Sequence, residues 1–254
     1  MSKLSVFLSN FTETPVGAPI QRKGLGRWFE LLEIHPVKLF WTNLLTFIFL
    51  IPCTICAFFF INMWDWLSML GVWIFFALAG PGITALHYIC IKISRGTPVW
   101  VKDDYFDCVK REWKKSIVLS LIVGALWLSA IYAVKMIVIV EGGISLTKLV
   151  FFLIYGYLLT GFSAFAYQQL AMIELPFKNV LENAVLLIFA GKGQSIKAIL
   201  CAYVVILLSI YFYNFSYFIL LIGFYALTVL TVNFIFMPVF DELFPDDRED
   251  SVEN

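Results

Sequence analysis

Two cysteines and two histidines are the side chains of this chain best suited to metal binding or catalysis. Cys53 and Cys56 form a C-x-x-C pair, a spacing found in zinc sites and in thiol–disulfide chemistry. The pair lies in an apolar run after Pro52, and neither a second cysteine pair nor a histidine at ligand spacing accompanies it. His35 and His87 are far apart in sequence. We therefore predict no metal, no cofactor and no catalytic residue, and we interpret the cysteines as small apolar residues.

The other polar residues within the apolar stretches are almost all neutral. Ionisable groups deep in a membrane are costly and usually serve ion- or proton-coupled transport. Here the nearest ones, Lys135 and Glu174, lie close to the ends of apolar stretches. His87 and the neutral polar residues are expected to hydrogen-bond between helices, namely Asn43, Thr46, Thr84, Ser129, Thr160, Ser163, Thr231 and Asn233. With no P-loop or glycine-rich nucleotide motif either, neither ion-driven transport nor an enzyme is expected.

The composition indicates what must position these residues. Of the 254 residues, 61% are hydrophobic and 14% are charged, and the mean hydropathy is +0.88. A soluble domain has about 45–50% apolar and about 25% charged residues, so this chain has more apolar side chains than one aqueous core can bury. The 18 basic and 18 acidic residues balance, which argues against a nucleic-acid binder. The sequence predicts an integral protein of the lipid bilayer.

Six apolar stretches are long enough to cross a bilayer as helices, which takes about 20 residues. They are Leu39–Ile61, Leu67–Ile93, Ile117–Val140, Leu146–Ile173, Ile196–Tyr213 and Tyr217–Val239. The predicted fold class is an all-α, six-helix transmembrane bundle over residues 39–240. A cytoplasmic or interfacial segment, 1–38, precedes the bundle, and an acidic cytoplasmic tail, 241–254, follows it. Residues 25–39 have the pattern of an amphipathic helix at the interface, and no cleavable signal peptide is expected.

The basic residues are distributed unevenly around these stretches. With six spans both termini lie on one side, and that side receives 16 of the 18 Lys and Arg residues. Only Lys135 and Lys148 fall toward the other side. Because positive charge concentrates in cytoplasmic loops, we predict that both termini are cytoplasmic. The acidic tail is interpreted as a solvated end, with contact to a basic partner surface as the alternative.

An internal repeat relates the second and fourth spans. At an offset of 79 residues Gly82–Tyr88 aligns with Gly161–Tyr167, and Ser116 aligns with Ser195. This predicts a duplicated unit of span, cytoplasmic helix and span, running the same way in both copies. Small residues let helices approach closely, and a proline flanked by glycines is expected to kink the second span. The candidate helix-packing or kink residues are Asn43, Gly80, Pro81, Gly82, Ala85, Gly161 and Ala164.

Each long cytoplasmic connection has a proline followed by an amphipathic pattern, in Val99–Lys115 and in Phe177–Ala190. In the first, Val101, Tyr105, Phe106, Val109 and Trp113 recur at roughly helical spacing, and charged residues mostly fill the other faces. Both packing at the membrane interface and docking onto a partner fit this pattern. At equivalent repeat positions, Arg95 and Glu174 offer an ion pair across a pseudo-two-fold axis. The candidate partner-contacting residues are Arg95, Lys102, Tyr105, Phe106, Val109, Arg111, Trp113, Glu174 and Leu181.

Two parts of the chain resemble signatures of a known family. Gly24–Trp28, followed by Trp41–Leu45, resembles its N-terminal signature. Gly80–Leu86, followed by Ser94–Gly96 and an aromatic, basic segment, resembles its second-span signature. On these motifs the chain resembles the YesL-like bacterial membrane proteins, a family known as a domain of unknown function. The resemblance is clearest over residues 24–117.

The resemblance implies a plasma-membrane protein of a Gram-positive bacterium and no known reaction. Genes of this family commonly lie beside those for carbohydrate ABC importers and glycan-degrading enzymes. The leading hypothesis is therefore a non-enzymatic accessory or regulatory subunit of such an importer, in contact with its permease and, through the cytoplasmic helices, with its ATPase. The alternative is a permease-like transporter of glycans or lipids, with an unidentified sugar or lipid ligand.

Overall fold

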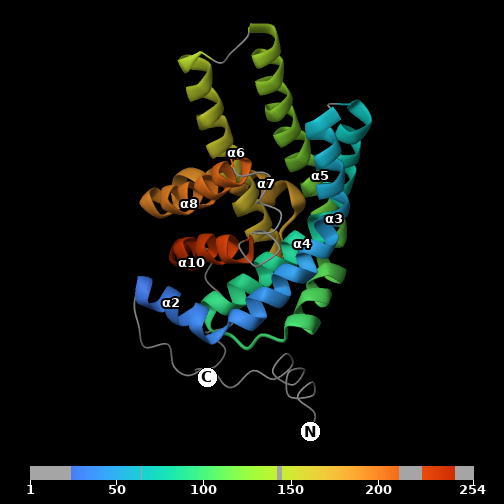
Figure 1. Cartoon of the computed structure of the whole chain (residues 1–254). Coiled ribbons are helices and arrows are strands. Elements are labelled where there is room, and N and C mark those ends of the chain that lie inside the picture. The colour runs from blue at the N-terminus through green and yellow to red at the C-terminus, as the bar shows by residue number, and fades with distance from the viewer. Residues whose placement is uncertain (1–23, 64, 142–144, 212–224, 244–254) are drawn as a thin grey trace, which may run out of the picture.

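The computed structural model describes residues 24–63, 65–141, 145–211 and 225–243, and within these ranges the chain is helical. Figure 1 shows the arrangement of the helices. In chain order they are α2 (Leu25–Ile34), α3 (Pro36–Met63), α4 (Trp66–Arg95), α5 (Val101–Glu141), α6 (Leu146–Met172), α7 (Phe177–Ala190), α8 (Lys192–Tyr211) and α10 (Tyr225–Leu243). The predicted all-α fold class is confirmed.

Five of these helices, α3, α4, α5, α6 and α10, are each long and apolar enough to cross a membrane. α7 and residues 193–209 of α8 meet that criterion only together, as a pair bent by 105°. The predicted span Ile196–Tyr213 therefore corresponds to one arm of a bent pair, up to residue 211. The predicted span Tyr217–Val239 is described only from Tyr225, where α10 begins. The chain is a multi-pass membrane protein, and its described residues contain five such helices, or six with the bent pair.

The central helix of the bundle is α4. It contacts α3, α5, α6 and α10, and half of its most apolar window is buried, compared with 22% for α3 and for α5. Its buried face is rich in small residues, which allow the neighbouring helices to approach. They include Ala77, Ala79, Gly80, Gly82 and Ala85. α4 continues through Pro81, so the predicted kink is not a break in the helix.

α5 is one helix of 41 residues, whereas the sequence predicted an amphipathic helix ending near Lys115 and a separate span. At 1.5 Å per residue it is about 60 Å long, twice the hydrocarbon thickness of about 30 Å. No glycine or proline interrupts residues 101–123. The charged residues of its first four turns identify the part that extends beyond the hydrocarbon. We call the end of the molecule where α4 stops and α5 starts the charged end.

The joint between α7 and α8 is a sharp turn at Gly191. A Cβ at this position would collide with Ser195 Oγ and lie 2.7 Å from Phe236 Cε2, so a larger residue would force these side chains to move. Ser195 Oγ donates to the carbonyl of Leu187 at 2.7 Å and so joins the first turn of α8 to the last turn of α7. At the repeat offset, Gly191 corresponds to Glu112, which lies within the continuous α5. The two copies therefore differ at this joint.

α2 is the predicted amphipathic helix before the first span, and it ends at Ile34. Leu31 is fully buried, whereas Leu25 and Phe29 are exposed, which separates an inward from an outward face. Arg27 Nη2 donates to the carbonyl of Ser94 at 2.9 Å, and Trp28 Nε1 donates to Thr231 Oγ1 at 3.1 Å. α2 is thereby attached to α4 and to α10.

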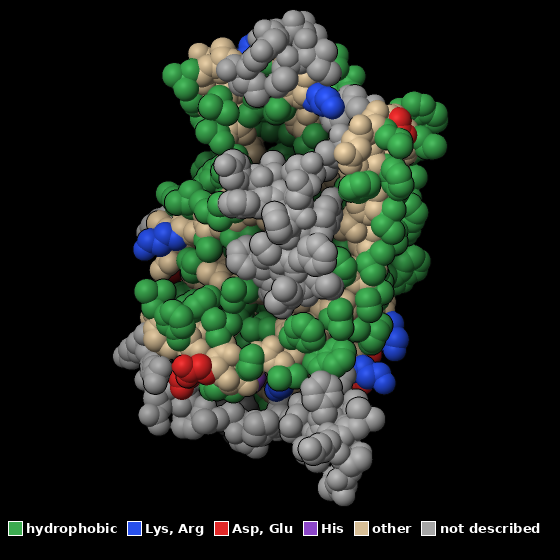
Figure 2. All heavy atoms as spheres, viewed as in Figure 1, with side chains coloured by type: hydrophobic (Ala, Val, Ile, Leu, Met, Phe, Trp, Pro, Cys, Tyr) green, Lys and Arg blue, Asp and Glu red, His purple; other side chains and the backbone are tan. Residues whose placement is uncertain are grey.

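The outer surface of the bundle is apolar. On the face seen in Figure 2, hydrophobic side chains cover most of the described surface and charged ones are few. Phe58, Ile154 and Phe151 are 53%, 54% and 68% exposed, which fits contact with lipid better than contact with water. The predicted acidic tail is described only to residue 243, and its first residues, Asp241 and Glu242, belong to α10.

Candidate functional site

The buried face of α5 differs from the predicted apolar stripe. It consists of Val101, Tyr105, Cys108, Glu112, Ser116 and Leu119. Tyr105 is fully buried, and its hydroxyl donates to the carbonyl of Gly82 at 3.2 Å and lies 3.1 Å from Thr46 Oγ1. The prediction that Tyr105 contacts a partner is therefore wrong, because Tyr105 fastens α5 to α3 and α4. Val109 is partly buried against the same core.

The opposite side of α5 carries exposed aromatic and basic residues. Lys102, Phe106, Lys110 and Trp113 follow one another at i, i+4, i+8 and i+11, which places them on one helix face. All four are exposed, Phe106 by 37% and Trp113 by 48%. We call these four residues the α5 outer face. Of the predicted stripe, Phe106 and Trp113 belong to this face, and Val101 and Tyr105 to the buried one.

An ion pair joins the end of α4 to the start of α5. Lys92 Nζ lies 2.8 Å from both carboxylate oxygens of Asp104. Asp104 also accepts from the main-chain N–H of Trp100 at 2.7 Å, one of the N–H groups that a helix start leaves without a helical partner. Charge-assisted bonds of this kind hold the charged end of α5 in a defined position.

A second cluster joins α5 to the end of α6. The Glu112 side chain is 5% exposed and lies 3.0 Å from Arg111 Nε and 3.9 Å from Lys115 Nζ. Arg111 Nη2 donates to the carbonyl of Ala171, and Lys115 Nζ donates to the carbonyl of Leu175, both at 3.3 Å. Cations at a helix C-terminus satisfy carbonyls that have no helical partner. We call Arg111, Glu112 and Lys115 the Glu112 cluster; the predicted partner residue Arg111 is engaged within it.

Tyr88 connects the two ionic groups. Lys92 Nζ lies 5.6 Å and Arg111 Cζ 5.4 Å from the centre of its ring, within the range of cation–π attraction. Tyr88, Asp104 and Glu112 were not among the predicted site residues. The burial of positions 105, 108, 112 and 116 follows the helical period and is the pattern that could have identified Glu112.

The predicted ion pair between Arg95 and Glu174 is wrong. Arg95 Nη2 lies 2.5 Å from Asp241 Oδ1 on α10. Glu174 is exposed between α6 and α7 and makes no ion pair with any described residue. The pair that does form joins α4 to α10, two helices that a pseudo-two-fold axis relating the repeats does not exchange.

α7 is the predicted amphipathic helix, and its buried face agrees with the sequence. The predicted partner residue Leu181 is partly buried and packs against the core, so only part of its side chain is accessible to a partner. The fully buried residues are Val180, Ala184, Leu187 and Ile188. Val185, Leu186 and Phe189 form an exposed side.

The predicted helix-packing residues lie at close contacts between helices. A Cβ on Gly80 would lie 2.5 Å from the main-chain oxygen of Ser116, and one on Gly161 would lie 2.7 Å from Ile199 Cδ1. Ala85 is fully buried, and Ala164 is partly buried against the core. A Cβ on Gly82 would meet Phe49 and Tyr105, each at 3.0 Å, and Pro81 is buried beside it. Close packing is thus the role of these small residues.

Asn43 connects two helices through a main-chain group. Its Oδ1 accepts from the N–H of Ala226 at 3.0 Å, and the side chain is almost fully buried. Ala226 is the second described residue of α10. Asn43 therefore ties α3 to α10 through the main chain, a contact that the sequence could not show.

Several of the predicted interhelical hydrogen bonds are present. Thr84 Oγ1 lies 2.8 Å from Ser116 Oγ. The hydroxyls of Ser120 and Tyr167, a further pair that was not predicted, lie 2.6 Å apart. His87 stacks on Tyr167, with ring centres 5.9 Å apart, and its Nδ1 lies 3.5 Å from Asn233 Nδ2. By contrast, Ser129, Thr160 and Ser163 donate to carbonyls of their own helices. The bonds between helices connect α4, α5, α6 and α10.

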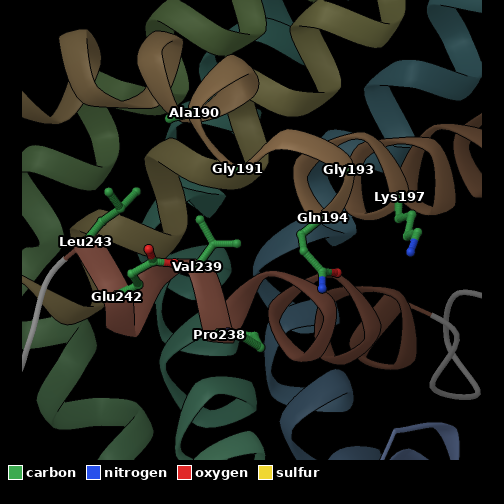
Figure 3. Close-up of a pocket in the computed structure, with 9 residues that line it drawn as sticks. All are labelled: Ala190, Gly191, Gly193, Gln194, Lys197, Pro238, Val239, Glu242 and Leu243. Carbon is green, nitrogen blue, oxygen red and sulfur yellow. The ribbon is translucent and has the colours of Figure 1, made fainter.

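A pocket of about 420 Å³ lies where α7 passes into α8 against the end of α10. In Figure 3, Gln194 points toward α10 and Glu242 points toward α7 and α8. Lys197 is the third polar side chain of the lining. The polar side chains of the lining are thus one amide, one amine and one carboxylate. Among the described residues no group of three His, Cys, Asp or Glu side chains could hold a metal ion, and the cysteines are free thiols.

Comparison with protein-family models, with curated proteins and with solved structures returned no match for this chain. The resemblance to the YesL-like family stays a prediction.

Proposed function

We propose that this protein is a non-enzymatic accessory or regulatory subunit of a carbohydrate ABC importer, located in a bacterial plasma membrane with both termini in the cytoplasm. The resemblance to the YesL-like family suggests the importer. The structure supports a docking role through the α5 outer face, the single observation that carries the proposal. Exposed aromatic residues such as Phe106 and Trp113 are typical of protein-binding surfaces.

The charge distribution supports the orientation. The described helices carry Lys92, Arg95, Lys110, Arg111 and Lys115 at the charged end. An excess of Lys and Arg is typical of cytoplasmic loops. α5 is longer than the hydrocarbon is thick. In this orientation its first turns extend into the cytoplasm, where a permease loop or an ATPase can reach them.

The geometry also supports a rigid docking element. The Lys92–Asp104 pair and the Glu112 cluster fasten the buried side of α5 to α4 and α6. The outer face is left to contact another molecule without reordering of the helix. A partner surface that combines apolar area with carboxylates matches this face, on which Phe106 and Trp113 alternate with Lys102 and Lys110.

Co-purification of the tagged chain from its native membrane in mild detergent tests this proposal. We expect the wild type to retain importer subunits, and Phe106→Ala with Trp113→Ala to reduce the retained amount by more than about tenfold, because truncating a single hot-spot aromatic costs about 2 kcal/mol and about 1.4 kcal/mol is already tenfold. Phe58→Ala with Phe151→Ala is the matched control, since both phenylalanines are exposed on the apolar surface. A wild type that retains no importer subunit, or equal retention by both double variants, would refute the proposal.

A second candidate function is a permease-like transporter of glycans or lipids. Buried amide groups favour it: within the described part of the chain, both polar side-chain atoms of Gln168, Oε1 of Gln169 and Oδ1 of Asn233 have no hydrogen-bond partner, although all three side chains are fully buried. Such groups inside a membrane bundle normally face water or a polar substrate. Proteoliposomes that contain only this chain should then take up labelled oligosaccharide or lipid. Absence of uptake under every gradient would exclude this candidate.

A further inference from the structure

Three basic residues lie on the inward side of the corner where α2 meets α3. His35 alone separates the two helices. Arg27 and Leu31 lie one turn apart and share a face of α2, and full burial of Leu31 shows that this face points into the protein. His35 follows directly after α2, and its Nδ1 is buried. Lys38 lies in the first turn of α3 and is 7% exposed. The corner therefore directs a guanidinium, an imidazole and an ammonium toward the interior.

Nitrogen atoms of all three residues are buried without an acceptor. Arg27 Nη2 donates to Ser94, but Arg27 Nε, His35 Nδ1 and Lys38 Nζ have no hydrogen-bond partner among the described residues. Buried donors are nearly always paired, and an unpaired ammonium withdrawn from water is the costliest of these three groups. Burial, together with the charge of Lys38, lowers the pKa of His35 to about 4, so its imidazole is neutral at pH 7. The corner thus has an excess of donors and of positive charge.

The outward side of the same corner is apolar. Leu25 is 78% exposed, Phe29 55%, and Val37 and Phe40 are each 44% exposed. An amphipathic helix with such a face lies at the boundary between hydrocarbon and headgroups. Lipid phosphates lie at the same level. A phosphate offers several charged oxygens, which suit Lys and Arg donors.

We propose that the α2–α3 corner binds a phosphate group, with Lys38 and His35 as the near donors and Arg27 as the donor on the α4 side. The group belongs to an anionic membrane lipid or to free phosphate. In either case it supplies the acceptor that these buried nitrogens lack, and it attaches the start of the first span to the α4–α10 end of the bundle.

Lipid retention by the full-length chain in neutral detergent, measured by native mass spectrometry, tests the proposal. We expect the wild type to retain phosphatidylglycerol in preference to phosphatidylcholine, and Lys38→Met to lower that retention about tenfold, because a hydrogen bond to a charged group is lost. Lys38→Arg should retain the lipid. Lys178→Met is the matched control, because Lys178 is exposed and its one ion pair with a described residue is to Glu182 on its own helix.

Thermal unfolding with inorganic phosphate or phosphatidylglycerol distinguishes the two sources. A higher unfolding temperature with the lipid alone assigns the site to a headgroup; one with phosphate alone assigns it to the free ion. Without either, Lys38→Met should unfold at a higher temperature than the wild type, because methionine removes an unpaired buried charge. Any of three results would overturn the proposal. They are equal lipid retention by Lys38→Met and Lys178→Met, an unchanged unfolding temperature of the wild type with either additive, and a Lys38→Met variant that is destabilised or unfolded.

Discussion

Replacing Gly80 with alanine is expected to lower the free energy of unfolding by about 3 kcal/mol, at the upper end of overpacking effects. A Cβ at this position would lie 2.1 Å from Ser120 Oγ and 2.5 Å from the main-chain oxygen of Ser116. A hydroxyl group can rotate away, but a carbonyl in the middle of α5 cannot. α4 and α5 would therefore have to separate along the most extensive helix contact of the bundle. Unfolding of the full-length chain by sodium dodecyl sulfate in mixed micelles measures the loss.

Two variants test the cause of that loss. Gly193→Ala is the matched control, because its Cβ would meet nothing within 4 Å, and alanine favours a helix by up to about 1 kcal/mol over glycine. Adding Ser120→Ala to Gly80→Ala should recover only part of the stability, since the Ser116 carbonyl stays in place. Equal stability of Gly80→Ala and Gly193→Ala would contradict the close packing of α4 against α5.

The small residues of the second and fourth spans were predictable as packing positions, but their partners were not. Gly80, Gly82 and Gly161 stand out in sequence because glycine is unfavourable in a helix unless close contact requires it. Which helix makes the contact depends on the tertiary arrangement. The same limit applies to Arg95, whose partner Asp241 lies 146 residues further along the chain. A pairing inferred from repeat equivalence alone gave Glu174 instead.

The apolar pattern of α5 was misread for a physical reason. Phe106 and Trp113 are apolar in composition but lie on the exposed side, whereas Glu112 is charged and lies on the buried side. Hydropathy alone cannot show that Arg111 and Lys115 lie beside Glu112 and compensate its buried charge. The joint at Gly191 was hidden for a similar reason: the repeat alignment pairs Gly191 with Glu112 without showing that the chain turns at one and continues as a helix at the other.

The Glu112 cluster yields the second large expected effect. Replacing both Arg111 and Lys115 with methionine should lower the free energy of unfolding by about 3–5 kcal/mol, because the Glu112 carboxylate stays buried without a cation. Glu112→Gln alone should cost about 1 kcal/mol, since the side chains of Arg111 and Lys115 are 42% and 40% exposed and water can solvate them. The buried member of the cluster thus depends on the exposed members more than they depend on it.

A triple variant separates this electrostatic cause from the loss of side-chain contacts. Arg111→Met, Glu112→Gln and Lys115→Met together should be more stable than the double methionine variant, although both lack the bonds to Ala171 and Leu175. Adding Glu112→Gln restores stability only if the unpaired carboxylate of Glu112 is the main cause of the loss. Lys110→Met with Lys114→Met makes the same charge change at exposed positions of α5 and should alter the unfolding free energy little. A triple variant no more stable than the double would show that the cluster acts through capping of α6 instead of through charge compensation.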